Sequence, residues 1–442
     1  MVALGLTISH LQAQSFEKAR LDSLMIGLES NNKAMGSLLI VKNGQPEYDK
    51  SIGYGLINKR KSEKLDKRSK YRIGSISKMF TAVITFQLIE EGKLQLSTPL
   101  ALYFPQLSNA QTITIEQMLG HKSGLYDYVK DWDSWRFTPK TDNDIVAMVA
   151  AQKPVFEPGT KTAYSNTNYL LLGYIIEKIC GKPYAQVLQE RITSKIGLKN
   201  TYYGGNINAK KKEAFSYAYE EGAWKQQTET HITAAGGAGG IVSTTADLTK
   251  FVQALFAKKL INQNSLDQML AIKEGIGMGI EQLPFYDKTL YGHSGQIDYF
   301  QSWLLYLPKD SVAIAYLSNG YDGVPVNDVL NGVLHLYYGK PYTIANYTSV
   351  AVAPAELDTY TGTYTCSQPA MQLKVIQQKG KLYAQATGQS PFPLDAVTTH
   401  TFKFDAAGIV IQFLENKQGL NLKQGGGTYV FTKDATAQPP AK

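Results

Sequence analysis

Two β-hairpins, far apart in the sequence, are predicted from the pattern of apolar and polar residues. Residues 37–42 are mostly apolar, an Asn-Gly pair follows, and residues 47–54 form the returning strand; Asn-Gly favours the tight turn of a hairpin. Residues 300–306 and 312–317 are a second pair of apolar runs, separated by a Pro-Lys-Asp turn. We expect these strands to join in one antiparallel sheet built from both parts of the chain, with helices inserted between them.

Helical spacing of apolar residues dominates the chain between the hairpins. Residues 75–91 are apolar on nearly every side, up to the helix stop at Gly92. Such a helix has to lie at the centre of a large domain, because it has no polar face to turn towards water. Thr244 and Asp247 resemble a capping box at the start of a helix that ends at Phe256. Further helices are predicted at residues 17–28, 115–119, 142–151, 168–179 and 326–338.

The composition changes after about residue 354, where helical periodicity is lost. Short strand-like runs, separated by Gly, Asn and Lys, lie at residues 362–364, 373–376, 382–386, 402–404, 409–413 and 429–431. Evenly spaced short strands are typical of a small all-β, barrel-like domain. The expected class is therefore α/β (α+β), with a first domain at residues 15–347, the all-β domain at residues 354–434 and a disordered tail at residues 435–442.

The N-terminus resembles the end of a secretory signal. Residues 1–14 are a short apolar stretch with a polar, Ala-containing end, and Ala13 lies near a cleavage point. The stretch lacks the basic residues that begin such signals, and a helical or frayed tail is the alternative interpretation. We expect residues 1–14 to be a signal-peptide remnant and the protein to be exported, to the periplasm or beyond. No other stretch approaches the length of a transmembrane segment.

The charge of the chain is concentrated in one segment. The 442 residues carry a formal net charge of +8, and residues 59–72 contain eight Lys and Arg residues. A solvated loop or hairpin is the favoured interpretation, and a patch that attracts an anionic polymer such as cell-wall material is the alternative. Nucleic acid is disfavoured as a partner, because no zinc-finger, RNA-recognition or helix-turn-helix pattern lies nearby.

The sequence predicts no metal and no cofactor. Cys180 and Cys366 are too few for a disulfide framework, and Cys180 lies in an apolar helical stretch as a core residue would. The six histidines are scattered and no H-E-x-x-H motif occurs, which disfavours zinc. The glycine-rich residues 236–240 lack the lysine and hydroxyl residue of a phosphate-binding loop.

Ser75 and Lys78 stand at the start of the predicted buried helix, where a spacing of three residues puts both side chains on one face. Serine needs a base to act as a nucleophile, and burial lowers the pKa of a lysine until it can accept the serine proton. Free N–H groups at the helix start would stabilise a developing oxyanion. The alternative is a serine N-cap followed by an exposed lysine, but an unpaired lysine inside an apolar helix is rare.

A second polar segment, Tyr164-Ser165-Asn166, comes just before the helix predicted at residues 168–179. A tyrosine beside cationic groups can shuttle a proton. An amide can bind a substrate carbonyl and hold the lysine in place. Taken alone, the segment would be interpreted as a turn with a packing tyrosine.

A third polar segment, His293-Ser294-Gly295-Gln296, comes just before the second predicted hairpin. Gly295 would let a substrate approach the backbone closely. His293 could contact the substrate or complete a proton relay, and the N–H of Gln296 could be a second oxyanion donor beside that of Ser75. A histidine at a strand edge is the alternative interpretation.

Together, the order and spacing of these segments resemble a known family. The matching segments are S-x-x-K at residues 75–78, L-x-H-x-S-G-L at 119–125, Y-x-N at 164–166 and a glycine-rich strand with a helix start at 239–247. They resemble the penicillin-recognising serine hydrolases: class C β-lactamases, D-alanyl-D-alanine carboxypeptidases, D-amino-acid peptidases and β-lactamase-like esterases. The resemblance covers roughly residues 16–342 and implies an antiparallel sheet flanked by helices with a helical subdomain. Residues 360–364 are similar to part of the β domain often appended to such hydrolases.

The resemblance implies a role for each segment. Ser75 would be acylated, Lys78 and Tyr164 would share the base and acid work, and Asn166 would position the substrate. His293, followed by Ser294 and Gly295, takes the place of the lysine in K-T-G, and the N–H groups of Ser75 and Gln296 would form the oxyanion hole. His121, in the L-x-H-x-S-G-L segment, is expected to be structural and to bind backbone.

The histidine at position 293 departs from the K-T-G motif of true class C β-lactamases. A lysine gives a fixed positive charge near a substrate carboxylate, whereas a histidine is only partly charged at neutral pH. We therefore expect a hydrolase that acts through a Ser75 acyl-enzyme on an amide, peptide or ester, with D-Ala-type peptidase or esterase favoured. Its partner would be a small-molecule or peptide substrate such as cell-wall peptide. The alternatives are a β-lactamase proper and a non-hydrolytic penicillin-binding sensor.

Overall fold

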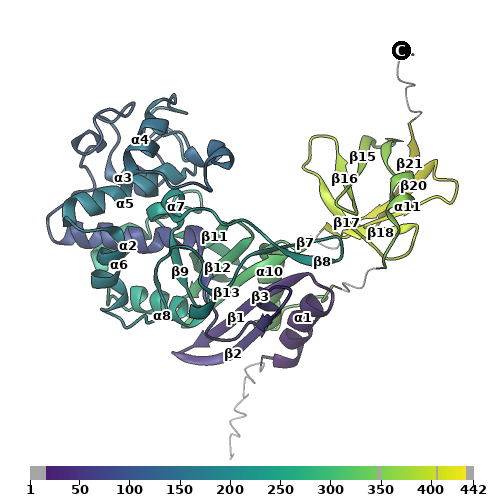
Figure 1. Cartoon of the computed structure of the whole chain (residues 1–442), viewed down its shortest axis with the longest axis horizontal. Coiled ribbons are helices and arrows are strands. Elements are labelled where there is room, and N and C mark those ends of the chain that lie inside the picture. Colours follow the sequence, from purple (N-terminus) through teal and green to yellow (C-terminus); the bar gives the residue numbers. More distant parts are fainter. Residues whose placement is uncertain (1–15, 346–349, 405–406, 435–442) are drawn as a thin grey trace, which may run out of the picture. The chain divides into compact units, whose positions relative to one another are not determined.

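The computed structural model describes residues 16–345, 350–404 and 407–434 (Figure 1). The chain divides into two compact units, one formed by Ala34–Asp322 and the other by the segments before and after it. The predicted signal remnant at residues 1–14 and the predicted tail at residues 435–442 lie outside the described residues. Helices and antiparallel sheet are mixed in the chain, which confirms the expected α+β class.

An antiparallel sheet runs through the first unit in the order β10-β11-β12-β13-β1-β2. The strands are β1 (Ala34–Lys42), β2 (Gln45–Ile52), β10 (Glu281–Phe285), β11 (Lys288–Ile297), β12 (Phe300–Leu307) and β13 (Val312–Tyr321). β1 pairs with β13, with Lys42 opposite Val312. The two predicted hairpins therefore meet in one sheet, as the apolar pattern indicated. A short ribbon of β7 (Tyr217–Glu220) and β8 (Ala223–Gln226) joins it through a parallel contact between β7 and β13.

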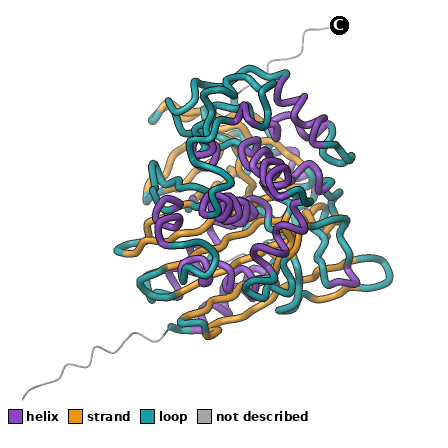
Figure 2. The backbone as a smooth tube through the Cα atoms, turned by 90° about the vertical axis from the view of Figure 1, so that its left-hand side faces the viewer, coloured by secondary structure: helices purple, strands orange, loops and turns teal. Residues whose placement is uncertain are grey.

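Helices fill the sequence between the two hairpins. The α-helices of this unit are α2 (Ser77–Glu90), α3 (Ile115–Leu119), α4 (Asp142–Ala150), α5 (Asn166–Cys180), α6 (Tyr184–Leu188), α7 (Ile232–Gly239), α8 (Thr245–Phe256) and α9 (Gln263–Met269). α2, α5 and α7 pack against one another, and α8 packs on β12, β13 and β1 (Figure 1). A view turned by 90° shows helices and strands next to one another along the backbone (Figure 2). Phe80 of α2 stacks on Phe251 of α8 with ring centroids 3.8 Å apart, so α2 links the helical part to the helix on the sheet.

The apolar helix predicted from residue 75 is the most enclosed element of this unit. Its first turn is the 3-10 turn η1 (Gly74–Ile76), and every residue of α2 from Ser77 to Leu88 is buried. Burial on all sides agrees with the absence of a polar face in the sequence. The buried set includes Lys78, whose amino group therefore has to find its partners inside the protein.

The start of α8 differs from the capping box that the sequence predicted. Thr244 accepts a hydrogen bond from the backbone N–H of Asp247 at 3.2 Å, as an N-cap residue does. The carboxylate of Asp247 instead accepts bonds from the backbone of Asn200 at 2.7 Å and the hydroxyl of Thr201 at 2.9 Å. Only half of the box forms, because this carboxylate is used to hold the neighbouring loop.

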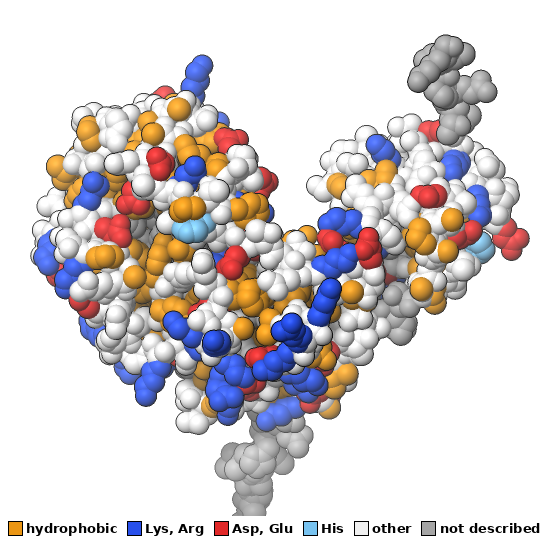
Figure 3. All heavy atoms as spheres, in the orientation of Figure 1, with side chains coloured by type: hydrophobic (Ala, Val, Ile, Leu, Met, Phe, Trp, Pro, Cys, Tyr) orange, Lys and Arg blue, Asp and Glu red, His pale blue; other side chains and the backbone are white. Residues whose placement is uncertain are grey.

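The basic segment at residues 59–72 includes the strand β4 (Ser62–Lys64), which pairs with β3 (Tyr54–Ile57) directly before the segment. Lys and Arg side chains gather on the lower part of the face in Figure 3. Arg72 departs from the solvated interpretation, because it lies in the buried strand β5 (Tyr71–Arg72), which pairs with β9 (Ile241–Ser243). β9 also pairs with β6 (Tyr202–Tyr203).

The second unit contains a closed barrel with its own hydrophobic core. Its strands are β14 (Gly362–Ser367), β15 (Ala370–Gln378), β16 (Lys381–Ala386), β17 (Phe392–Ala396), β18 (Thr401–Phe404), β19 (Ile409–Phe413), β20 (Gly419–Gln424) and β21 (Gly427–Lys433). The helices of this unit are α1 (Lys18–Ser30), α10 (Val326–Tyr337) and α11 (Pro354–Thr359). The barrel agrees with the predicted all-β class, while the domain limits at residues 347 and 354 stay a prediction.

Two barrel strands were not predicted from the sequence. β17 contains Pro393, and proline is a poor strand former because it lacks an N–H group. β20 begins at Gly419 and alternates between the buried Leu420 and Leu422 and polar neighbours. Its period-two pattern was present in the sequence, but it is too short to stand out from the surrounding Gly and Lys residues.

Candidate active site

Ser75 lies in the turn η1, directly beside strand β11. The preceding Gly74 has φ +50°, and a Cβ atom there would lie 2.6 Å from the backbone N of Gln296. Only glycine fits this close approach. The hydroxyl of Ser302 donates to the carbonyl of Ile73 at 2.9 Å, which ties the start of the turn to the sheet. Ser75 is thereby held next to the backbone of Gln296.

Lys78 points its amino group at Ser75 from within the helix. Its Nζ lies 2.9 Å from Ser75 Oγ, 2.8 Å from Asn166 Oδ1 and 2.9 Å from the carbonyl oxygen of Ala238. Complete burial lowers the pKa of Lys78 to about 7, although the carboxylates of Asp127 and Glu281 act in the opposite direction. A large share of the molecules therefore carry a neutral amine at neutral pH.

The partners of Lys78 match the bonding capacity of a neutral amine. Asn166 Oδ1 and the Ala238 carbonyl can only accept hydrogen bonds, so they take the two N–H groups. The remaining lone pair then faces Ser75 Oγ. Ser75 can donate its proton to that lone pair, which is the contact that general base catalysis requires.

Tyr164 approaches Ser75 from the segment before α5. Its hydroxyl lies 2.7 Å from Ser75 Oγ, and the Nζ of Lys78 lies 4.9 Å from the centroid of its ring. Tyr164 is 40% exposed, and desolvation by the groups packed around it raises its pKa above the ordinary value. Tyr164 is therefore a neutral proton donor at neutral pH.

His121 supports the ring of Tyr164. The two rings stack with centroids 4.4 Å apart, and the backbone N–H of Ser165 donates to His121 Nδ1 at 3.1 Å. Burial holds the pKa of His121 well below its usual value, so the ring is neutral and Nδ1 acts as an acceptor. The histidine binds backbone, as the sequence analysis expected, and it positions Tyr164.

Asp127 was not singled out from the sequence, yet it fixes Asn166. One carboxylate oxygen accepts a bond from the backbone N–H of Asn166 and the other from its side-chain Nδ2, both at 3.1 Å. Because Nδ2 faces Asp127, Oδ1 has to face Lys78. Asp127 follows the matched segment 119–125 by two residues, and this position is the feature of the sequence that could have pointed to it.

His293 lies in β11 and is buried. Its Nδ1 lies 2.6 Å from the carbonyl oxygen of Ser294, and its Nε2 lies 3.9 Å from a carboxylate oxygen of Glu281. Burial lowers the pKa of His293, against the opposing effect of the Glu281 carboxylate, so the ring is neutral at neutral pH. The histidine therefore bonds to its own strand, and its ring centroid lies 6.4 Å from that of Tyr164.

The remaining residues of the third segment lie along the strand beside Ser75. A Cβ atom at Gly295 would lie 2.0 Å from the carbonyl oxygen of Ile73, so this position requires glycine. Ser294 is half-buried, and the side chain of Gln296 is exposed. The structure thus brings Ser75, Lys78, Tyr164 and Asn166 together by hydrogen bonds, with the backbone of residues 294–296 alongside.

A buried ion-pair cluster, also not predicted, secures the turn after Gln296. Asp298, only 1% exposed, lies 3.1 Å from Arg136 and 3.5 Å from Arg72. It also accepts bonds from the backbone and the hydroxyl of Thr230. These contacts fasten the β11–β12 turn to the segment that leads into α7.

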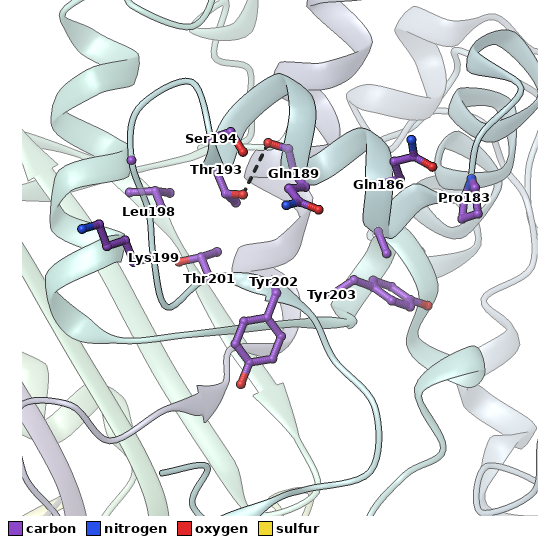
Figure 4. Close-up of a pocket in the computed structure, with 12 residues that line it drawn as sticks. Pro183, Gln186, Gln189, Thr193, Ser194, Leu198, Lys199, Thr201, Tyr202 and Tyr203 are labelled. Carbon is purple, nitrogen blue, oxygen red and sulfur yellow. Dashed lines mark hydrogen bonds between the residues drawn. The ribbon is translucent and has the colours of Figure 1, made fainter. Parts of the chain in front are cut away.

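A cavity of about 840 Å³ lies away from Ser75, between α6 and the segment that leads to β6 (Figure 4). Amide, hydroxyl and aromatic side chains such as Gln186, Thr193 and Tyr203 line it. Ser75 and Lys78 are not among its lining residues. The candidate active site is the polar cluster around Ser75, which lies apart from the residues that line this cavity.

Both Cys180 and Cys366 are free, and the described residues include no group of three His, Cys, Asp or Glu side chains placed to hold a metal ion. Within the described part of the chain, no helix is both long and apolar enough to cross a membrane.

The fold, with serine, lysine and tyrosine in hydrogen-bond contact, has the arrangement typical of the penicillin-recognising class of serine hydrolases. The family model described as Beta-lactamase matches residues 27–338, and the chain belongs to this family. The resemblance inferred from the motifs is thereby confirmed.

One of three similar proteins matches far more of the chain than the family model does. A penicillin-binding protein of Bacillus subtilis is 25% identical over 90% of this chain and 94% of its own length. The teichoic acid D-alanine hydrolase of Staphylococcus aureus is 27% identical over 70% of this chain and 76% of its own length. The structure of D-amino acid amidase from Ochrobactrum anthropi SV3 in complex with D-phenylalanine matches with a TM-score of 0.63 and 25% identity, covering 72% of this chain and 98% of that one.

Proposed function

We propose that the chain hydrolyses an amide, peptide or ester bond through an acyl-enzyme on Ser75. One observation supports this most strongly: Ser75 Oγ lies 2.9 Å from the amine of Lys78 and 2.7 Å from the hydroxyl of Tyr164. Both distances allow direct proton transfer, so the serine has a base and an acid within reach.

In the acylation step, Ser75 Oγ attacks the substrate carbonyl carbon while its proton moves to the lone pair of Lys78. The backbone N–H groups of Ser75 and Gln296 stabilise the oxyanion of the tetrahedral intermediate. The bond to the leaving amine or alcohol then breaks, and Tyr164 donates a proton to the leaving group. The ammonium of Lys78 then gives a proton back to Tyr164. The acylation step therefore takes up no proton from solvent.

In the deacylation step, water attacks the acyl-enzyme and gives up one proton to the Lys78 and Tyr164 pair. The ester bond to Ser75 breaks, the acid product leaves, and the serine oxygen takes the proton back. Asn166 keeps the Lys78 amine in place in both steps, because its amide orientation is fixed by Asp127.

The substrate we favour is a D-aminoacyl amide, peptide or ester. Two relatives are named for hydrolysis of teichoic acid D-alanine and of D-amino acid amides. The neutral His293 offers no fixed positive charge for the carboxylate of a β-lactam, so peptidase or esterase activity is favoured over β-lactamase activity. A cell-wall substrate would be met outside the cytoplasm, and we propose that the protein acts in the periplasm or after secretion.

A labelling experiment tests this function. A fluorophosphonate probe should add one label to the wild-type protein and none to Ser75→Ala, and p-nitrophenyl esters should be turned over by the wild type alone. Equal labelling of both proteins would contradict the assignment of Ser75. A label from penicillin that is stable and is accompanied by no turnover of any ester or anilide would favour the sensor over the hydrolase.

A further inference from the structure

Next to Tyr164 lie two polar side chains, those of Glu281 and His293, that the proposed acyl transfer does not use. Glu281 of β10 and His293 of β11 line a small cavity together with Tyr164 and His121. Its volume of about 10 Å³ is close to the space taken by one water-sized group. A protonated primary amine has that size at its end.

Both members of this pair present hydrogen-bond acceptors to each other. A carbonyl oxygen can only accept, so the 2.6 Å contact with Ser294 requires the proton of His293 to sit on Nδ1. In the neutral ring Nε2 is then an acceptor, and it faces the Glu281 carboxylate at 3.9 Å. This distance exceeds a hydrogen bond, and two acceptors that face each other lack a donor between them.

The backbone around Glu281 holds this arrangement in place. Gly279 has φ +78°, and a Cβ atom there would lie 2.5 Å from Ala82 Cβ and 3.1 Å from the carbonyl oxygen of Lys78. The segment before Glu281 therefore lies directly on the turn of α2 that contains Lys78. The other carboxylate near the site, that of Asp127, already binds Asn166.

We infer that Glu281 and His293 Nε2 together bind the ammonium group of a substrate that carries a free α-amine. An α-amine is two bonds from the carbonyl carbon that Ser75 attacks, and Tyr164 both touches Ser75 and lines the cavity. The ammonium would donate one bond to the carboxylate and one to the imidazole. This inference rests on the proposed function and narrows its substrate to amino acid amides or esters with an unblocked amine.

The test compares two anilides that differ only at this group. D-Alanine p-nitroanilide has the ammonium at neutral pH, and D-lactic acid p-nitroanilide has a hydroxyl in its place. Glu281→Gln keeps the size of the side chain and removes its charge, and should lower kcat/KM for the alanine substrate by roughly 10- to 100-fold while changing the lactic substrate by less than about 3-fold. Glu274→Gln, the same change at an exposed glutamate of the preceding turn, should alter neither.

Fluorophosphonate labelling separates this inference from the proposed function. Suppose that the wild type and Glu281→Gln are both labelled at Ser75. If the variant then loses activity equally on the two anilides, or loses none on either, the ammonium site is wrong and the hydrolase stands. If the wild type is not labelled at all, the hydrolase itself is wrong. A second readout needs only the wild type: D-alaninamide should protect Ser75 from the label at concentrations about 10-fold lower than D-lactamide, and equal protection would overturn the inference.

Discussion

The site around Ser75 and the barrel of the second unit both contain a tyrosine next to a histidine. In the barrel, Tyr360 lies 2.6 Å from His400 Nδ1 and donates to Glu356 at 2.8 Å. In the site, Tyr164 stacks on His121 and donates to Ser75. Burial raises the pKa of both tyrosines. The residue types and the direction of the shift are the same in the two regions.

The difference lies in what the tyrosine hydroxyl faces. The hydroxyl of Tyr360 bonds to side chains that connect α11 with the barrel. The hydroxyl of Tyr164 bonds to the hydroxyl of Ser75, which also contacts the buried amine of Lys78. Lys78 has two acceptors and no carboxylate in direct contact, so its burial is only partly compensated. A shifted pKa therefore indicates a catalytic role only where the titratable groups also contact a nucleophile, as Tyr164 and Lys78 contact Ser75.

The largest expected effect comes from Lys78→Met, which removes the base and keeps the volume. We expect kcat to fall by about 10³-fold or more, because Ser75 loses its proton acceptor. Lys182→Met, a change at an exposed lysine paired with Glu190, is the matched control and should leave kcat unchanged. Retention of more than a tenth of wild-type activity by Lys78→Met would remove Lys78 from the mechanism.

The same variant should change how stability depends on pH. Between the folded pKa of about 7 and the unfolded value of 10.5, the unfolded state binds one more proton at Lys78 than the folded state. The free energy of unfolding of the wild type should therefore rise with pH by about 1.4 kcal/mol per unit relative to Lys78→Met. Parallel urea unfolding curves of both proteins from pH 7.5 to 9.5 measure this difference, and a constant offset would contradict it.

Asp298→Asn is expected to lower the free energy of unfolding more than it lowers kcat. The change leaves Arg72 and Arg136 without their shared buried carboxylate, and breaking a buried ion pair typically costs about 3–5 kcal/mol. Denaturant unfolding measures the loss. Asp133→Asn, at an exposed partner of Arg136, should cost less than about 1 kcal/mol, and an equal cost for both variants would show that the buried cluster has no special weight.

Asp127→Asn tests the positioning of Asn166. Without the carboxylate, the amide of Asn166 is no longer held with Oδ1 towards Lys78, and we expect kcat to fall by roughly 10- to 100-fold with little change in KM. The pH profile of kcat should also shift, because a negative charge near Lys78 is lost and the pKa of its amine falls further. A change in KM alone would indicate a substrate contact instead.

Tyr360→Phe in the barrel is expected to have the smallest effect and to complete the comparison. Loss of the hydroxyl removes two hydrogen bonds and should cost about 1 kcal/mol of stability, with no change in kcat. A fall in kcat of about 10-fold or more for Tyr360→Phe would mean that the barrel tyrosine takes part in the chemistry, and would contradict the distinction between the two regions.

Sequence patterns predicted the parts of the fold that repeat with a regular period. The apolar helix from residue 75 and the hairpins that form the sheet are set by the local alternation of apolar and polar residues. Short elements such as α6 and β17 were missed, because a single turn or a proline-containing strand has too few positions to show a period. The burial of Arg72 was missed for a different reason, since its carboxylate partner Asp298 is distant in the sequence.

The candidate site divides in the same way. Ser75, Lys78, Tyr164 and Asn166 belong to motifs with fixed spacing, so the sequence alone could single them out. Asp127 and Glu281 act through side chains that only the folded chain brings near those motifs. Glu281 in particular reaches His293 because β10 and β11 are neighbours, with Glu281 opposite Gly292 in their pairing.

The central claim is that burial lowers the pKa of the Lys78 amine to about 7, so that about half of it is neutral at neutral pH and can accept the proton of Ser75. A ¹³C-NMR titration of the lysine Cε signals, with Lys78 assigned by its absence in Lys78→Met, measures this protonation state directly. The account predicts a midpoint near pH 7 for that one signal. A midpoint near 10.5, the ordinary value for lysine, would contradict it.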